Sequence, residues 1–242
     1  LPLSAPIQRA LRERNYESLT PIQAKAIPPL LDGRDLLGCA QTGTGKTAAF
    51  SLPILKALAE DPRKIRPRTA RVLVLTPTRE LAKQVGDSLR TYGRYLEIYH
   101  SLVYGGVGQG PQVSAMRRGV DVLVACPGRL LDLVSQGHVD LSDVEFFVLD
   151  EVDRMLDMGF QKDVTRIVDL LPGDRQSLFF SATLAKPIVK LAQTILYDPV
   201  TITIEPEKTT AEDVQQEVCF IDRANKRSLL VQRLEAQGEG QL

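Results

Sequence analysis

Short apolar runs recur along the chain and alternate with stretches that have helical spacing of apolar residues. The apolar runs are Asp35–Cys39, Val72–Leu75, Leu102–Tyr104, Val122–Ala125, Phe146–Leu149, Leu178–Phe180 and Val200–Ile204. They are apolar on both faces, which is typical of strands that helices cover on both sides. Between the last two runs, residues 188–196 carry apolar side chains at the i, i+3, i+4 positions of an amphipathic helix. The alternation predicts an α/β fold with an open, mostly parallel, doubly wound sheet and helices on both faces.

The pattern changes near the C-terminal end of the chain. Residues 205–216 are polar and include Pro206, so we expect a linker there. One strand candidate, Glu217–Ile221, and one helix candidate, Asn225–Ala236, follow. A single strand and helix cannot bury a core by themselves. We therefore predict one domain over 1–205, and over 206–242 a linker with the truncated start of a second domain, or a segment that packs on the first.

Composition narrows the class of protein. The 242 residues are 43% hydrophobic and 25% charged, with 30 basic and 30 acidic residues. A net charge of zero means that any nucleic-acid contact must come from local basic clusters. The basic run Arg63–Arg71 lies between and beside prolines and favours a solvated loop over an RNA site.

The number and spacing of the cysteines, together with hydropathy, indicate the cellular compartment of the protein. The three cysteines (Cys39, Cys126 and Cys219) are far apart, which fits a reducing environment and argues against a disulfide framework or a zinc site. We expect Cys39 and Cys219 to lie in the core, since both fall in apolar strand candidates. No apolar run approaches about 18 residues and no leader-like segment stands at the start. The expectation is a cytoplasmic protein without a membrane partner.

A glycine-rich loop follows the first apolar run. It reads Ala40-Gln41-Thr42-Gly43-Thr44-Gly45-Lys46-Thr47 and leads into a helix-like segment. Gly43 and Gly45 allow backbone N–H groups to turn inward around a polyphosphate, and the following helix adds its positive end. Lys46 can reach the β- and γ-phosphates, and the Thr47 hydroxyl can ligate Mg²⁺. Because Ala40 stands where the pattern usually begins with glycine, a turn that merely joins strand to helix is the alternative.

A second chemical signal follows the strand candidate Phe146–Leu149. It ends in Asp150 and Glu151, with Asp153 two residues further on. Asp150 can hold Mg²⁺ directly or through a water, and Glu151 can orient and deprotonate an attacking water. The alternative is an acidic helix start, because Asp and Glu favour first turns.

Further motifs occur in a fixed order around these two. They are Thr20-Pro21-Ile22-Gln23 with Tyr16 seven residues before Gln23, Pro77-Thr78-Arg79-Glu80-Leu81-Ala82, Gly105-Gly106, Pro127-Gly128-Arg129 and Ser181-Ala182-Thr183. Together with the loop at 40–47 and the acidic strand end at 150–153, this order resembles the N-terminal RecA-like domain of DEAD-box ATP-dependent RNA helicases. Gly106–Gly110 and Thr209–Glu212 point, more weakly, to the bacterial RhlE-type branch.

The resemblance implies a RecA-like P-loop NTPase domain that uses ATP and Mg²⁺. Tyr16 would stack on the adenine, and the Gln23 amide would pair with the N6 and N7 edge of the base. The phosphates would lie on the loop, and Mg²⁺ would lie between Thr47 and Asp150. The implied phosphate-binding residues are Thr42, Gly43, Thr44, Gly45, Lys46 and Thr47, and the implied catalytic residues are Lys46, Asp150 and Glu151. A surface glutamine at the start of a helix is the alternative for Gln23.

RNA contacts are also implied. Two arginines would clamp phosphates of one strand, and paired glycines would allow close backbone approach. The implied RNA-binding residues are Pro77, Thr78, Arg79, Gly105, Gly106, Pro127, Gly128 and Arg129. Ser181 and Thr183 would hydrogen-bond Asp153 and so couple the ATP site to RNA. Solvated arginines and a strand end of small residues are the respective alternatives.

The chain departs from the family pattern at three places. Val152 occupies the third position of the acidic motif, where no catalytic group is needed, so chemistry should survive. Cys126 stands where the family usually has Thr, which replaces one hydroxyl with a weak thiol donor. The family's aromatic upstream of Tyr16 would fall before Leu1.

The resemblance implies that ATP binding and hydrolysis are coupled to RNA binding and local duplex unwinding. The partners are RNA, as a single strand or a locally melted duplex, and a second RecA-like domain. That domain carries arginine fingers whose motifs do not occur in residues 1–242, so this chain alone is expected to be nearly inactive. Two alternatives are an RNA-binding scaffold with a degenerate ATPase, and a DNA-acting or small-molecule P-loop enzyme. The second is disfavoured, because Gln23 with Tyr16, Arg79 and Ser181–Thr183 have no reason to co-occur in a P-loop kinase.

Overall fold

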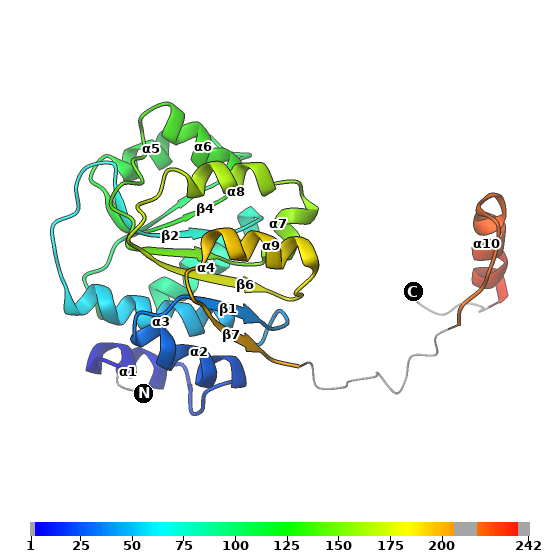
Figure 1. The fold of residues 1–242 in the computed structure, drawn as a ribbon, viewed down its shortest axis with the longest axis horizontal. Coiled ribbons are helices and arrows are strands. Elements are labelled where there is room, and N and C mark those ends of the chain that lie inside the picture. The colour runs from blue at the N-terminus through cyan, green and yellow to red at the C-terminus, as the bar shows by residue number, and fades with distance from the viewer. Residues whose placement is uncertain (1–2, 206–216, 237–242) are drawn as a thin grey trace. The chain divides into compact units, whose positions relative to one another are not determined.

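Seven parallel strands form one sheet in the order β3-β4-β2-β5-β6-β1-β7. The computed structural model describes residues 3–205 and 217–236 and divides the chain into two compact units, Leu1–Pro206 and Glu207–Leu242 (Figure 1). The strands of the first unit are β1 Leu36–Cys39, β2 Ala70–Leu75, β3 His100–Val103, β4 Val120–Ala125, β5 Phe146–Leu149, β6 Gln176–Ser181 and β7 Val200–Thr203. The predicted open parallel α/β sheet is confirmed.

Burial of the strands follows their place in the sheet. All six residues of β2 and of β4 are buried, as expected for strands covered on both faces. The edge strands differ, and for them the expectation of two covered faces is wrong. In β7, Thr201 and Thr203 are exposed and Ile202 is buried, while in β3 buried and half-buried residues alternate. An edge strand has a neighbour on one side only, so helices need not cover both of its faces.

Two hydrophobic clusters lie on the two sides of the sheet. Alternate residues of one strand enter different clusters: Val72 and Val74 pack with the first, Leu73 and Leu75 with the second. The first cluster includes α2 and α3, and the second includes α6 and α8, which Figure 1 shows at opposite ends of the view. The helices of this unit are α1 Ala5–Arg12, α2 Pro21–Leu31, α3 Lys46–Glu60, α4 Arg79–Tyr92, α5 Gly110–Met116, α6 Pro127–Ser135, α7 Val152–Asp157, α8 Gln161–Val168 and α9 Lys186–Ile195.

The second unit contains a short 3₁₀ helix, η1 Arg223–Asn225, followed by α10 Lys226–Ala236. The helix candidate at 225–236 is therefore confirmed. The strand candidate at 217–221 is wrong, because 217–222 has no regular structure and none of the described residues of that unit forms a strand beside it. Cys39 is buried in β1 as expected, whereas Cys219 is exposed and the expectation of a core position is wrong. The linker candidate lies almost wholly outside the described residues.

The basic run Arg63–Arg71 is a loop up to the start of β2, and its exposed Arg63, Lys64, Arg66 and Arg68 fit the expected solvated loop, whereas Arg71 is buried. Arg71, at the start of β2, is only 4% exposed and pairs with Glu145 at 2.9 Å and with Asp61 at 3.0 Å. Arg66 donates to Asp143 at 2.6 Å. Because carboxylates pair with Arg63, Arg66 and Arg71, much of the positive charge of the run is opposed, which argues against an RNA site.

Within 3–205 and 217–236, none of the helices has both the length and the apolar character that crossing a membrane requires.

Close packing at Gly38 in β1 generates a prediction about stability. A Cβ atom at Gly38 would lie 2.7 Å from Cδ1 of Phe180, a fully buried ring on the neighbouring strand β6. We expect Gly38→Ala to lower the free energy of unfolding by about 1–3 kcal/mol, because the ring must shift within a packed core. Urea denaturation measures this change. Gly108→Ala, where a Cβ meets nothing within 4 Å, is the matched control. Equal stability of the two variants would contradict the packing argument.

Candidate functional site

The strand order sorts the motifs into two neighbouring groups. All strands are parallel, so their carboxyl ends lie at one edge of the sheet. Three adjacent strands, β5, β6 and β1, lead into Asp150, Ser181–Thr183 and the loop at 40–47. Three further adjacent strands, β2, β4 and β3, lead into the motifs at 77–79, 126–129 and 105–106, and the edge strand β7 leads into none of them. Since β2 pairs with β5, the two groups adjoin each other along this edge.

The loop at 40–47 has the conformation that its glycines permit. Gly43 and Gly45 have φ of 82° and 93°, and α3 begins directly afterwards at Lys46. The Lys46 Nζ donates to the Ala40 carbonyl at 3.0 Å, which holds the ammonium group over the start of the loop, and the residue is only 6% exposed. The loop therefore stands at the N-terminus of a 15-residue helix, a place that favours anions.

Gln23 lies against this loop. Its Nε2 donates to the Gly45 carbonyl at 3.1 Å, and its Oε1 accepts from the Thr20 backbone N–H at 3.1 Å. At 2% exposure the residue is buried, so the alternative of a surface glutamine is wrong. A glutamine amide has two donors and two acceptor lone pairs. One of each is used here, which leaves one donor and one acceptor for the edge of a base.

Tyr16 is half exposed and tied to α4. Its hydroxyl lies 2.8 Å from the hydroxyl of Tyr92, the last residue of that helix. The two rings meet edge to face, with centroids 5.9 Å apart and planes at 84°. Tyr16 as a whole residue is 42% exposed. An aromatic ring held in this way can offer its open surface to a stacking partner.

The acidic pair after β5 is buried. Asp150 is 2% and Glu151 9% exposed, and the Asp150 backbone N–H extends the pairing with β2 by donating to the Leu75 carbonyl at 3.0 Å. Burial raises the pKa of Asp150 to about 6; Lys46 opposes this rise, and Glu151 adds to it. Glu151 adopts the left-handed conformation with φ of 54°, and its N–H donates to Asp150 Oδ1 at 3.1 Å. A solvated acidic helix start does not fit this burial.

Asp150 and Thr47 suit a magnesium ion better than a transition metal. Among the described residues no group of three or more His, Cys, Asp or Glu side chains is arranged to hold a metal ion. Mg²⁺ typically takes one or two carboxylates and completes its shell with water and substrate phosphates. A carboxyl that is costly to ionise alone is stabilised in its charged form by a nearby divalent cation. The residues therefore fit Mg²⁺ bound together with a polyphosphate.

The contact between Asp153 and residues 181–183 differs from the expectation. Asp153 Oδ2 accepts from the Ala182 backbone N–H at 3.1 Å, while the Ser181 hydroxyl accepts from the Thr183 N–H at 3.3 Å. The expected side-chain hydrogen bonds from Ser181 and Thr183 to Asp153 are not formed. Ser181 is fully buried at the end of β6, so its hydroxyl turns to the nearest backbone donor. The main chain makes the link instead.

The second group of motifs forms an open face. Thr78 caps α4 by accepting from the Leu81 N–H at 3.3 Å, and the exposed Arg79 guanidinium lies 5.4 Å from the centre of the Tyr104 ring. Nothing lies within 4 Å of a Cβ built at Gly105, Gly106 or Gly128. Pro127, at the start of α6, is buried.

Arg129 and Cys126 tie α6 to its neighbours. Arg129 Nη1 donates to the Val107 carbonyl at 3.1 Å, and its side chain is only 16% exposed, so a freely solvated arginine is the wrong description. The Cys126 thiol lies 3.9 Å from the Thr76 hydroxyl, and burial raises its pKa. Motif residues from three strand ends therefore meet on this face. Sequence reasoning missed Thr76 and Tyr92, which lie outside the motifs, and missed that the backbone N–H of Ala182, within a motif, contacts Asp153.

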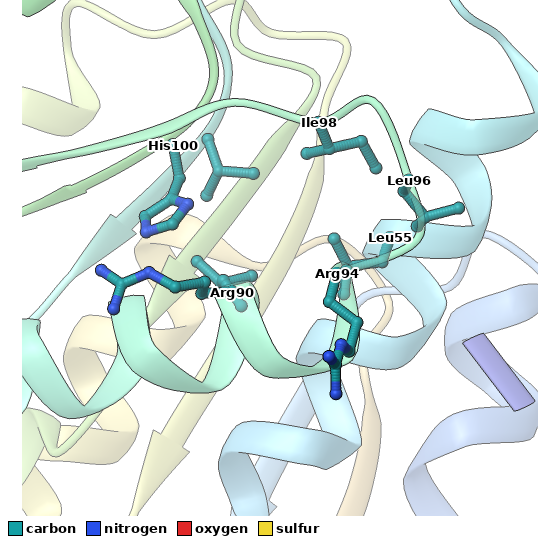
Figure 2. Close-up of a pocket in the computed structure, with 9 residues that line it drawn as sticks. Leu55, Arg90, Arg94, Leu96, Ile98 and His100 are labelled. Atoms are coloured by element: carbon teal, nitrogen blue, oxygen red, sulfur yellow. The ribbon is translucent and has the colours of Figure 1, made fainter. Parts of the chain in front are cut away.

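A small pocket of about 170 Å³ lies away from both groups of motifs (Figure 2). It is bounded by the C-terminal part of α4 and the amino ends of β3 and β4, the edge opposite to the motifs, and none of the predicted site residues lines it. Figure 2 shows Arg90 extending alongside His100. Burial lowers the pKa of His100, and the nearby Arg90 lowers it further, while Asp87 opposes both.

Comparison with known proteins identifies the family. A profile of the family "DEAD/DEAH box helicase" matches residues 20–191. "ATP-dependent RNA helicase DeaD" of Escherichia coli (strain K12) is 42% identical over 238 residues, covering 98% of this chain and 37% of that protein. "ATP-dependent RNA helicase DeaD" of Mycobacterium tuberculosis (strain CDC 1551) is 43% identical over 232 residues, covering 96% and 40%. "DEAD-box ATP-dependent RNA helicase 3A, chloroplastic" of Zea mays is 43% identical over 235 residues, covering 95% and 31%.

A solved structure shares the fold. The crystal structure of a hypothetical ATP-dependent RNA helicase from Sulfolobus tokodaii matches with a TM-score of 0.76 and 37% identity, covering 84% of this chain and 57% of that one. The fold is thus that of a RecA-like α/β domain, as expected. The chain belongs to the DEAD/DEAH box helicase family. It spans 31% to 40% of the length of the curated relatives described above.

The half-buried His100 leads to a prediction about the pH dependence of stability. Its pKa is lowered in the folded chain, so between the ordinary histidine pKa of about 6.5 and the lower folded value the unfolded chain binds more protons. The free energy of unfolding should therefore fall as pH falls through this window. In His100→Gln the fall should be shallower, because the residue no longer titrates. Urea denaturation at pH 5 and pH 8 measures it. If the free energies of unfolding of parent and variant differ by the same amount at both pH values, the burial argument is contradicted.

Proposed function

We propose that this chain is the N-terminal, ATP-binding domain of an ATP-dependent RNA helicase, which couples ATP binding and hydrolysis to RNA binding and local duplex unwinding. The observation that carries the proposal is the strand order. It sets the phosphate loop, Asp150 and Ser181–Thr183 on three adjacent strands, beside the Arg79 and Arg129 motifs on the next three. Because the chain spans less than half of its curated relatives, the activity and partners of the whole protein are part of the proposal.

Nucleotide phosphates would lie on residues 42–47 at the N-terminus of α3, with Lys46 reaching the β- and γ-phosphates. Its ammonium group now donates to Ala40, and a phosphate oxygen is a stronger, charged acceptor that would draw it away. Mg²⁺, held by Thr47 and Asp150, would supply charge neutralisation at the phosphates. Glu151 would orient the attacking water and accept its proton.

The base would lie between Tyr16 and Gln23. Tyr16 offers an exposed ring for stacking, and Gln23 retains one donor and one acceptor beside the loop. Adenine presents an N6 donor and an N7 acceptor on that edge, while guanine presents acceptors at O6 and N7. An amide that offers one donor and one acceptor therefore favours ATP over GTP.

RNA would lie along the open face formed after β2, β4 and β3. Arg79 is exposed there, and the glycines at 105, 106 and 128 leave space for the backbone of a strand. The Ala182–Asp153 hydrogen bond lies between this face and the phosphate loop in strand order, so we propose that Asp153, Ser181 and Thr183 form the coupling segment. The link would run through the main chain rather than through the two hydroxyls.

We propose that residues 206–242 form a linker and the beginning of a second RecA-like domain, which would supply arginines to the γ-phosphate. The exposed Val218, Phe220 and Leu230 of the second unit support this, since such residues usually pack in a core. A cytoplasmic location remains a prediction, supported by three free cysteines. The RhlE-type branch also remains a prediction: it rests on Gly106–Gly110 and on Thr209–Glu212, which lies outside the described residues, while the bacterial relatives described above carry the name DeaD.

Replacing Gln23 should weaken adenine selectivity. We expect Gln23→Ala to cost one or two hydrogen bonds to the base, about 1–3 kcal/mol of ADP binding, and to reduce the preference for ADP over GDP. Calorimetric titration of both nucleotides against parent and variant measures this. Gln84→Ala, an exposed glutamine on α4, is the matched control and should bind as the parent does. Equal binding of ADP and GDP by the parent would show that Gln23 does not read the base.

Replacing Glu151 should abolish turnover while sparing binding. In the full-length protein, Glu151→Gln should retain ATP binding and lose RNA-stimulated hydrolysis by about 10²–10⁴-fold, because a positioned general base is removed. A coupled ATPase assay with and without RNA measures it. Asp157→Asn, an exposed carboxylate on α7, and Val152→Ala should stay within a few-fold of the parent. Normal turnover by Glu151→Gln would exclude this residue as the base and remove the main support for the proposed hydrolysis.

A further inference from the structure

The hydroxyl pair of Tyr16 and Tyr92 fixes an exposed ring. Tyr16 lies in the segment between α1 and α2 and is 42% exposed, whereas Tyr92 is 6% exposed and belongs to the first hydrophobic cluster. Their hydroxyl oxygens are 2.8 Å apart, and the edge of one ring faces the other. Burial raises the pKa of Tyr92 well above its usual range, so its hydroxyl keeps the proton at any working pH. A buried anchor therefore holds the exposed ring in one orientation.

A second set of contacts fixes the same segment to the same end of α4. Glu13 accepts from the Tyr95 hydroxyl at 2.6 Å and pairs with Arg94 at 2.8 Å. Both partners follow α4 directly in sequence, and the Arg9 guanidinium lies 4.1 Å from the centre of the Tyr95 ring. These groups are largely solvent-exposed, and exposed ion pairs contribute little. The Tyr16–Tyr92 contact is thus the more buried of the two attachments.

We propose that Tyr92 is a positioning residue for the base site: its hydroxyl holds Tyr16 in the orientation that stacks on an adenine. The proposal rests on the proposed function, because it takes Tyr16 as the stacking residue. A free side chain loses rotamer freedom when a ligand orders it, and a side chain that is already held loses less. The gain appears only when the ligand carries a base.

Tyr92 and Arg79 lie at opposite ends of the same helix, α4. Tyr92 is its last residue, and the RNA-facing Arg79 is its first. The helix has 14 residues, so its two ends lie about 20 Å apart. One helix therefore carries the support of the base site at one end and a predicted RNA contact at the other.

The test compares two ligands on parent and Tyr92→Phe chains. This substitution removes one oxygen and keeps the buried ring. We expect ADP affinity to fall by about 2- to 10-fold, the range for one lost hydrogen bond. Affinity for inorganic triphosphate, which has no base, should be unchanged. Tyr99→Phe, which removes a hydroxyl from a 72% exposed tyrosine, is the matched control and should bind both ligands as the parent does. If Tyr92 had a purely structural role, the variant would have a lower unfolding temperature, and its affinities for ADP and triphosphate would fall equally or not at all. Either result would overturn the proposal.

Substitutions at Tyr16 separate this inference from the proposed function. Tyr16→Phe should weaken ADP as Tyr92→Phe does, and the double variant should be no weaker than either one, because both remove the same hydrogen bond. Additive losses would overturn the proposal. Tyr16→Ala removes the ring and should weaken ADP more than either hydroxyl deletion. If Tyr16→Ala leaves ADP binding unchanged, the proposed base site is wrong. If it weakens ADP while Tyr92→Phe does not, only the role of Tyr92 is wrong.

Discussion

The parallel course of all seven strands is the constraint on which the rest of the structure depends. Every carboxyl end lies at one edge of the sheet, so each loop that follows a strand is delivered to the same side. Because β6 lies between β1 and β5, the segment 181–183 is inserted between the phosphate loop and the acidic pair. The contact of Ala182 with Asp153 follows directly from that order. A different order of the same strands would keep every motif and separate the groups that act together.

Buried charged residues at the two edges of the sheet differ in whether an opposite charge lies beside them. At the amino edge Arg71 is buried with Glu145 and Asp61 in reach, so its charge is matched within the fold. At the carboxyl edge Asp150 is buried beside Glu151, and its raised pKa shows that its charge is poorly matched. A fold selected for stability alone would pair or remove such a group. The unmatched negative charge of Asp150 is therefore informative about function, since a cation bound together with a polyphosphate would balance it.

Sequence patterns predicted what depends on short stretches of chain. The run Phe146–Leu149 coincides with β5, and the glycines at 43 and 45 adopt the positive φ that a phosphate loop needs. Contacts between distant segments were harder to predict. A hydroxyl was expected to donate to Asp153, but the donor is the Ala182 backbone N–H. The Ser181 hydroxyl does not reach Asp153, because Ser181 is enclosed by the sheet. The strand expected at 217–221 does not form, since apolar spacing alone cannot supply a neighbour to pair with.

The residues proposed for base recognition and those proposed for phosphate recognition come from different parts of the fold. The phosphate loop belongs to the β1–α3 connection, while Tyr16 and Gln23 come from residues that are not part of the sheet. Gln23 connects the segment before β1 to the loop by donating to the Gly45 carbonyl. A Cβ atom at Gly45 would lie only 2.4 Å from the Gln23 amide nitrogen. Any residue other than glycine at 45 would therefore push Gln23 away, besides straining a φ of 93°. Under the proposed function, one glycine would serve both recognition tasks: it would shape the turn around the phosphates and admit the side chain that reads the base.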